Sequence, residues 1–218
     1  MKPLGILMLD TRFPRIVGDV GNPASFDFPV ILRTMTGIGP ADAVAAHPDR
    51  PRVLAALADN AAKLAQAGAA GIGTSCGFLA LYQDELAAAS PVPVATSALL
   101  LIASLKGRRV GVITASAKNL TPAHLTAVGA PGDTPVEGMP ERGSFAATFL
   151  ANGTTLDRDA VEAEAVAAGR ALLARHPQVD TIVLECTNLP PYKPALERAL
   201  GLPVHDVLDL LKEFHGRL

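Results

Sequence analysis

The chain has 218 residues, and its 19 Lys and Arg residues nearly balance its 21 Asp and Glu residues, giving a formal net charge of −2. This length is enough for one large domain or two small lobes with a hydrophobic core. The charged residues form no basic stripe, which argues against a nucleic-acid partner, and no apolar run approaches a membrane span. The N-terminal residues do not resemble a signal peptide, so we expect a cytoplasmic protein with reduced thiols.

Short apolar runs alternate with alanine-rich helical patterns in the first half of the chain. The spacing of apolar residues predicts a helix over residues 51–67 that ends at Gly68. The other elements expected here are strands at residues 4–9 and 70–74, an extended piece at residues 91–95, and helices at residues 77–89 and 97–105.

The second half repeats this alternation. Its clearest amphipathic helix covers residues 157–175, with Asp157 as the expected N-cap and acidic residues in its first turns. The other expected elements are strands at residues 109–114, 180–185 and 202–204 and helices at residues 191–200 and 206–214. Alternation of this kind predicts an α/β fold in which parallel sheets are covered by helices on both faces, with a lobe boundary near residues 93–97.

Two cysteines each follow a predicted strand directly. Cys76 and Cys186 are 110 positions apart, and Gly5 and Gly111, which lie in two similar strands, are 106 positions apart. This near-equal offset indicates an internal repeat. Because open α/β sheets bind ligands at the carboxyl ends of their strands, the repeat predicts an active site with one thiol on either face of a substrate.

Other roles for the cysteines are less consistent with this placement. A buried Cys is often a small core residue, and that alternative stays open for either one taken alone. A disulfide is disfavoured because nothing indicates an oxidising compartment. No metal site is expected, because neither Cys lies in a Cys-x-x-Cys or Cys/His spacing.

Four predicted strand ends carry small and hydroxyl-bearing residues. Backbone N–H groups at a following helix N-terminus can bind an anion, so these ends suit a carboxylate substrate without a dedicated arginine. Helix capping is the alternative role of the Ser and Thr residues, and the two roles are compatible. The four segments are Asp10-Thr11, Thr74-Ser75-Cys76-Gly77, Thr114-Ala115-Ser116 and Glu185-Cys186-Thr187-Asn188.

These segments resemble motifs of the aspartate/glutamate racemase superfamily, and the resemblance covers essentially the whole chain. The matching motifs also include Leu9 before the first segment, Gly111-Val112-Ile113 before Thr114 and Leu189-Pro190 after the last. That superfamily includes cofactor-independent amino acid racemases, hydantoin racemases, maleate isomerases and arylmalonate decarboxylases. The resemblance implies two pseudo-symmetric α/β lobes, each a parallel sheet flanked by helices, with the active site in the cleft between them. It places residues 1–94 and 205–218 in the first lobe and residues 95–204 in the second.

The resemblance also implies roles for individual residues. Cys76 and Cys186 are the two expected catalytic bases, because a thiolate on one face and a thiol on the other can invert an α-carbon. An unperturbed thiol has a pKa of about 8.5, so we expect helix N-terminal amides to lower one of them. The expected substrate contacts are Asp10 (as a polar neighbour of Cys76), Thr11, Ser75, Gly77, Thr114, Thr187 and Asn188.

The chain also departs from the family's patterns. Asn188 stands where glutamate racemases have His, so a glutamate-specific enzyme is not favoured. The Gly- and Pro-rich loop over residues 11–29 is a candidate lid, in which Arg12 or Arg15 either pairs with a second substrate carboxylate or is simply solvated. His205 and Asp206 either approach the cleft or, for Asp206, cap the last helix.

We therefore expect an isomerase: a racemase or epimerase that inverts the α-carbon of a small carboxylate, with an aspartate-like amino acid as substrate, acting as a homodimer. No phosphate loop, dinucleotide fingerprint or pyridoxal-phosphate context is present, so no cofactor and no metal are expected. The alternatives within enzymes are a maleate-isomerase-like reaction and a hydantoin racemase. The alternative outside enzymes is a protein that binds or senses small acids without turnover.

Overall fold

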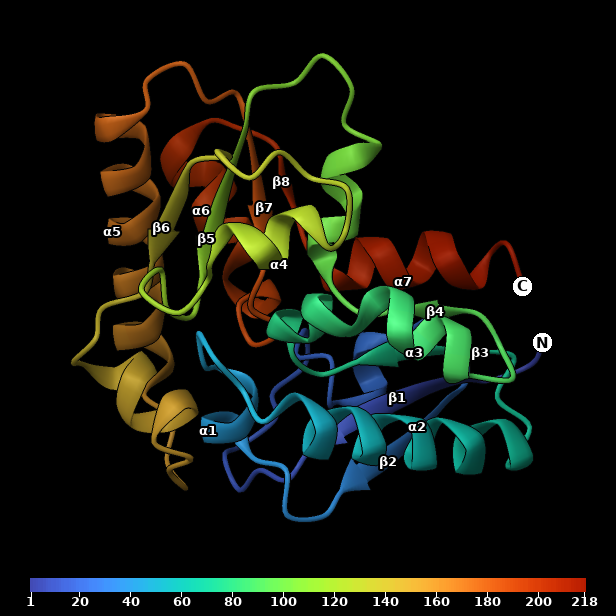
Figure 1. The fold of residues 1–218 in the computed structure, drawn as a ribbon. Helices are drawn as coiled ribbons and strands as arrows, with labels where there is room; N and C mark the ends of the chain where they lie inside the picture. The colour runs from blue at the N-terminus through green and yellow to red at the C-terminus, as the bar shows by residue number, and fades with distance from the viewer.

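The computed structural model describes all 218 residues and contains two four-stranded parallel sheets, each flanked by helices (Figure 1). The first sheet has the order β2-β1-β3-β4, formed by β1 (Leu4–Leu9), β2 (Val30–Met35), β3 (Gly71–Thr74) and β4 (Val94–Ala95). The second has the order β6-β5-β7-β8, formed by β5 (Val110–Thr114), β6 (Val136–Gly138), β7 (Thr181–Leu184) and β8 (Val204–His205). The expected two-lobe α/β fold is confirmed.

Helices cover the faces of both sheets. The α-helices are α1 (Pro40–Ala43), α2 (Arg50–Gln66), α3 (Gln83–Ala89), α4 (Pro122–Thr126), α5 (Arg158–Arg175), α6 (Lys193–Leu200) and α7 (Val207–His215). Four 3-10 turns and one π-helical turn complete the elements: η1 (Pro23–Ser25), η2 (Gly77–Tyr82), η3 (Ala98–Ala103), η4 (Ala146–Leu150, the π turn) and η5 (Pro190–Tyr192). None of the helices combines the length and the apolar character needed to cross a membrane.

The internal repeat is visible in the strand register. Leu4 of β1 lies opposite Gly71 of β3, and Val110 of β5 lies opposite Thr181 of β7. These pairs are related by the offsets found in the sequence, 106 residues for the first strand of each lobe and 110 for its neighbour. The two lobes therefore have the same strand order and the same register, so equivalent strand ends present equivalent positions.

Local signals predicted the long elements and the edge strands β4 and β8, but missed the other two edge strands. The Asp157 side chain caps α5 by accepting a hydrogen bond from the backbone N–H of Ala160, and Asp206 caps α7, as expected. The helix expected at residues 77–89 is instead a 3-10 turn, η2, followed by α3. The edge strands β2 and β6 were not predicted, because most of their residues are only half-buried and show no apolar alternation.

The C-terminal helix α7 packs on the first sheet, close to the N-terminus (Figure 1). A Cβ atom at Gly73 of β3 would lie 2.6 Å from Leu211, so the lack of a side chain lets the helix approach the strand. His215 at the end of α7 contacts the backbone carbonyl of Lys2 at 2.9 Å. These contacts support the proposed assignment of residues 206–218 to the lobe of residues 1–94, whereas His205, also expected there, pairs with Val183 as part of β8 in the second sheet.

Replacing Gly73 with valine tests this packing. Because the added side chain would overlap Leu211, we expect Gly73→Val to lower the free energy of unfolding by about 1–3 kcal/mol in urea denaturation. Thr34→Val, an isosteric change at an exposed position of β2, is the control and should change it by less than about 0.5 kcal/mol. Equal effects of the two substitutions would contradict the close approach of α7.

Candidate active site

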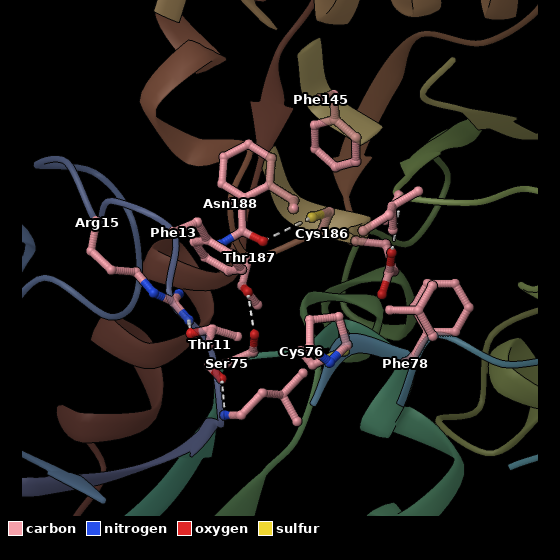
Figure 2. Close-up of a pocket in the computed structure, with 18 residues that line it drawn as sticks. Thr11, Phe13, Arg15, Ser75, Cys76, Phe78, Phe145, Cys186, Thr187 and Asn188 are labelled. Carbon is pink, nitrogen blue, oxygen red and sulfur yellow. Dashed lines mark hydrogen bonds between the residues drawn. The ribbon is translucent and has the colours of Figure 1, made fainter. Parts of the chain in front are cut away.

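A small cavity lies between the two lobes at the carboxyl ends of their strands, and its volume is about 30 Å³. Figure 2 shows Ser75 and Cys76 on one side of it and Cys186, Thr187 and Asn188 on the other. The lining residues come from both halves of the chain: Leu9, Thr11, Phe13, Arg15, Pro40, Val44, Ser75, Cys76, Gly77, Phe78, Ala115, Phe145, Phe149, Leu150, Glu185, Cys186, Thr187 and Asn188.

Most of the predicted site residues meet in this cavity. They are Thr11, Ser75, Cys76, Gly77, Cys186, Thr187 and Asn188. Two do not line it. The Asp10 carboxylate points elsewhere and accepts a hydrogen bond from the backbone N–H of Gly37 (2.9 Å), and the buried Thr114 hydroxyl donates to Glu185 (2.7 Å). Any effect of Thr114 on a substrate therefore passes through Glu185.

The two lobes touch directly at the floor of the cavity. The Thr187 hydroxyl donates a hydrogen bond to the backbone carbonyl of Ser75 at 2.6 Å. A Cβ atom at Gly77 would overlap the carbonyl oxygen and the Oε1 atom of Glu185. Glycine at position 77 is thus required for the close approach of the strand ends that carry the two cysteines.

Burial raises the pKa of both thiols. For Cys76, burial and then the nearby Glu185 charge raise the pKa to about 12, although the backbone N–H groups of Phe78 and Leu79 and the Arg15 guanidinium act in the opposite direction. The expected helix-terminal amides are therefore present, but the expected net lowering of the pKa is wrong. Desolvation of a thiolate outweighs two amide donors in a site this enclosed.

Fewer groups stabilise the thiolate of Cys186 than that of Cys76. Burial, followed by the charge of Glu185, raises the pKa of Cys186 well above its ordinary value. Only the backbone N–H of Asn188 lowers it, while the thiol itself donates to the Asn188 side-chain oxygen at 3.7 Å. A thiolate at either position consequently needs additional positive charge, such as a cationic group on the substrate.

Glu185, for which no role was expected from the sequence, also lines the cavity. It is fully buried, and burial raises its pKa to about 7 against the opposing hydrogen bonds from Thr114 and Ala115. Its Oε2 atom accepts both of these bonds, and its Oε1 atom has no partner. The available signal was its position, a carboxyl group at the end of an apolar strand directly before Cys186.

One of the two loop arginines reaches the cavity. Arg15 forms an ion pair with Asp19 (2.8 Å), donates to the Thr11 hydroxyl (2.8 Å) and lies over the Phe13 ring at 4.4 Å from its centroid. Asp19 also accepts a hydrogen bond from the Asn188 side chain at 2.7 Å. Asn188, the departure from the glutamate racemase pattern, thereby ties the loop to the second lobe.

Three other residues considered from the sequence lie away from the cavity lining. Arg12 is exposed, and its backbone N–H and guanidinium bond to Asn152. His205 lies within 4.0 Å of Asp209 on α7, and the Asp206 carboxylate caps the same helix. These local interactions, with Asn152 for Arg12 and at the start of α7 for His205 and Asp206, are sufficient to explain the three side chains.

Four phenylalanines form much of the cavity wall. Phe13 and Phe149 meet edge to face with ring centroids 4.9 Å apart, and Phe145 and Phe149 are 5.0 Å apart. Phe78 directly follows Gly77 on η2. Periodicity gave no sign of the wall, because residues 145–149 lie outside every predicted element, Phe13 lies in a loop, and Phe78 lies in a predicted helix with no signal for the cavity. Only tertiary packing brings Phe13, Phe145 and Phe149 together, and Phe78 lies apart from them against the His124 ring.

Comparison with known proteins agrees with the geometry. The family model for Asp/Glu/hydantoin racemases matches residues 28–213. The chain belongs to this family. The resemblance noted from the sequence is therefore confirmed, and family and fold together indicate an enzyme of the aspartate/glutamate racemase superfamily.

The chain is also similar in sequence to proteins described as dimethylsulfoniopropionate lyases. The chain is 30% identical over 217 residues to a dimethylsulfoniopropionate lyase of Durusdinium sp. clade D, covering 94% of this chain and 71% of that protein. It is 32% identical over 227 residues to dimethylsulfoniopropionate lyase 5 of Emiliania huxleyi, covering 98% of this chain but only 45% of that protein.

Solved structures show the same fold. The chain is similar to arylmalonate decarboxylase, with a TM-score of 0.61 and 22% identity over 93% of this chain and 86% of that chain. It is similar to glutamate racemase from Francisella tularensis subsp. tularensis SCHU S4 in complex with D-glutamate, with a TM-score of 0.62 and 14% identity over all of this chain and 81% of that chain.

Neutralising Glu185 tests its perturbed ionisation. The pKa of Glu185 is higher in the folded chain (about 7) than its ordinary value of 4.5. The protonated Glu185 therefore contributes fully to the free energy of unfolding below pH 4.5, and this contribution is lost as the pH rises through 7. We expect the gain in unfolding free energy from Glu185→Gln to be greater at pH 8 than at pH 4.5 by about 3 kcal/mol. Urea denaturation at the two pH values measures this difference, and a pH-independent difference would contradict it.

Proposed function

We propose that this protein is a cofactor-independent lyase that removes the α-proton of a small carboxylate and expels a sulfonium group from the β-carbon, with dimethylsulfoniopropionate as substrate. The observation that carries this proposal is the phenylalanine wall of a cavity that also holds two thiols. The proposal shares its first step, proton abstraction beside a carboxylate, with the racemase reaction expected from the sequence.

The cavity wall suits a cation that has no N–H groups. Phe78, Phe145 and Phe149 line it with aromatic rings, and aromatic faces attract cations such as quaternary ammonium groups. Phe13 completes the wall, although the Arg15 guanidinium already covers one face of its ring. A primary ammonium needs three hydrogen-bond acceptors, and in an apolar pocket each unmet donor is costly. A sulfonium carries positive charge without donors, so it suits this wall better than the ammonium of aspartate.

The buried thiols favour the same substrate. The pKa of Cys76 is raised to about 12 because burial disfavours the thiolate. A sulfonium bound in the same enclosed space would offset this effect by placing positive charge near the sulfur. The substrate would then assist in forming the base that attacks it, and the cavity would hold little free thiolate before binding.

The carboxylate of the substrate would lie toward the polar end of the cavity. Arg15 and the Thr11 hydroxyl are there, together with the strand-end segment of Ser75 and Gly77. Because Asp19 already pairs with Arg15, this end offers little charge for a second substrate carboxylate. An aspartate-like substrate is for this reason the second choice, behind a monocarboxylate.

The reaction balances without a cofactor. A cysteine thiolate takes the α-proton, and the C–H electron pair becomes the new carbon–carbon double bond. The bond between the β-carbon and sulfur breaks with its electron pair on sulfur, releasing neutral dimethyl sulfide and acrylate. The thiol then returns its proton to solvent, and backbone amides beside the carboxylate would stabilise the enediolate-like charge that develops.

A racemase or epimerase is the second candidate, favoured by one observation. Cys76 and Cys186 occupy equivalent positions of the two lobes and line the same cavity, as inversion by two opposed bases requires. Maleate-isomerase-like or hydantoin racemase activity, or acid binding without turnover, are outcomes of the same assay. The expected homodimer and cytoplasmic location stay predictions.

Nuclear magnetic resonance in D₂O distinguishes these functions. With dimethylsulfoniopropionate, we expect the vinyl signals of acrylate and the methyl signal of dimethyl sulfide to appear together in equal molar amounts. Aspartate, a hydantoin and maleate form the comparison panel. Loss of the α-proton signal with loss of optical rotation in aspartate or the hydantoin, without acrylate release, would replace the lyase by a racemase. Conversion of maleate, or no turnover of any compound in the panel, would likewise overturn the lyase proposal.

Single cysteine variants test the number of bases. Elimination needs one base, so Cys76→Ser and Cys186→Ser should differ, with one lowering kcat by about 10²–10⁴-fold and the other by far less. Racemisation needs both thiols, so both variants would be inactive. Steady-state acrylate release measures the effect, and equal loss in both variants would contradict a one-base elimination. Comparable urea denaturation midpoints would exclude misfolding as the cause.

A further inference from the structure

The two lobes differ in chemistry at one pair of equivalent positions. Ser75 follows β3 and its hydroxyl accepts a hydrogen bond from the backbone N–H of Leu9 at 2.9 Å. Glu185 follows β7 at the equivalent position, and its Oε2 atom accepts from the backbone N–H of Ala115 at 3.4 Å. A serine hydroxyl in one lobe and a glutamate carboxylate in the other therefore accept the hydrogen bond from equivalent backbone N–H groups.

Glu185 has an oxygen that this structural role does not use. Its Oε2 atom takes the hydrogen bonds from Ala115 and the Thr114 hydroxyl, whereas Oε1 is buried without a partner. A protonated carboxyl carries its hydrogen on the oxygen that is not already accepting, which here is Oε1. The resulting O–H would lie against Gly77, where a Cβ atom would overlap it, at the boundary of the cavity.

We propose that Glu185 is a catalytic acid of this site: its neutral carboxyl donates a hydrogen bond from Oε1 to the substrate carboxylate. This inference rests on the proposed function, since it assumes a carboxylate ligand in the cavity. Proton removal from the α-carbon moves negative charge onto the carboxylate oxygens. A neutral acid beside them stabilises this charge, whereas an ionised Glu185 would repel it.

The neighbouring charges agree with a neutral group. The ionisable groups that line the cavity with Glu185 are the thiols of Cys76 and Cys186 and the Arg15 guanidinium, which is paired with Asp19. An ionised Glu185 raises the pKa of both thiols, so it opposes formation of the base as well as binding of the anion. Burial, which raises its own pKa to about 7, keeps it protonated in mildly acidic solution.

Binding of propionate, which lacks a leaving group, tests the proposal independently of turnover. By calorimetry between pH 5.5 and 9, we expect the wild-type affinity to fall about tenfold per pH unit above pH 7. Glu185→Gln keeps a neutral donor at the Oε1 position, so its affinity should not change over this range. Glu185→Ser, the residue of the other lobe, should bind propionate weakly at every pH and release acrylate about 10²-fold more slowly at pH 6.

The matched control is Glu213→Gln, an exposed charge neutralisation on α7 that should retain the wild-type pH dependence. A Gln variant with the wild-type pH dependence would overturn the role of Glu185, and so would a Ser variant with wild-type affinity. Absence of propionate binding to the wild type at pH 6 would overturn it as well. Failure to release acrylate, with these binding profiles intact, would refute the lyase and leave the Glu185 acid standing.

Discussion

The close approach of two strand ends, one from each lobe, is the constraint on which the site depends. Thr187 donates to the Ser75 carbonyl across the seam, and Gly77 lies so close to Glu185 that no larger residue fits. Parallel sheets direct their strand carboxyl ends, with their free amides, toward the same edge. Placing two such edges face to face encloses a small cavity, and the two cysteines line it because each lies two positions after the end of one of these strands.

Enclosure then controls the electrostatics. The same burial that excludes water raises the pKa of Cys76 and of Glu185, and Arg15 offers limited compensation because Asp19 pairs with it. A site of this kind holds its acids neutral and forms a thiolate only when a ligand alters the local charge. A substrate that carries a cation on one end and a carboxylate on the other meets both requirements.

Repetition of the fold and divergence of its strand ends explain how one architecture supports different reactions. The lobes share strand order and register. At equivalent positions of the repeat, however, Ser75 corresponds to Glu185 and Phe78 corresponds to Asn188. Inversion of a carbon depends on what the lobes share, the two thiols. In the lyase that we propose, elimination of a charged group would depend on what the lobes do not share, the aromatic wall and Glu185. Fold likeness to racemases and a decarboxylase is compatible with both.

Local sequence determined the strand-helix alternation, the Asp157 and Asp206 caps and the position of each cysteine after a strand, because these depend on neighbouring residues along the chain. It also carried the family resemblance. Tertiary structure alone decided that Arg15 and not Arg12 reaches the cavity, that Phe145 and Phe149 line it, and that Glu185 is buried with one oxygen unpaired. These properties depend on desolvation and on contacts between residues 70 to 169 positions apart in the chain, which periodicity and spacing do not encode.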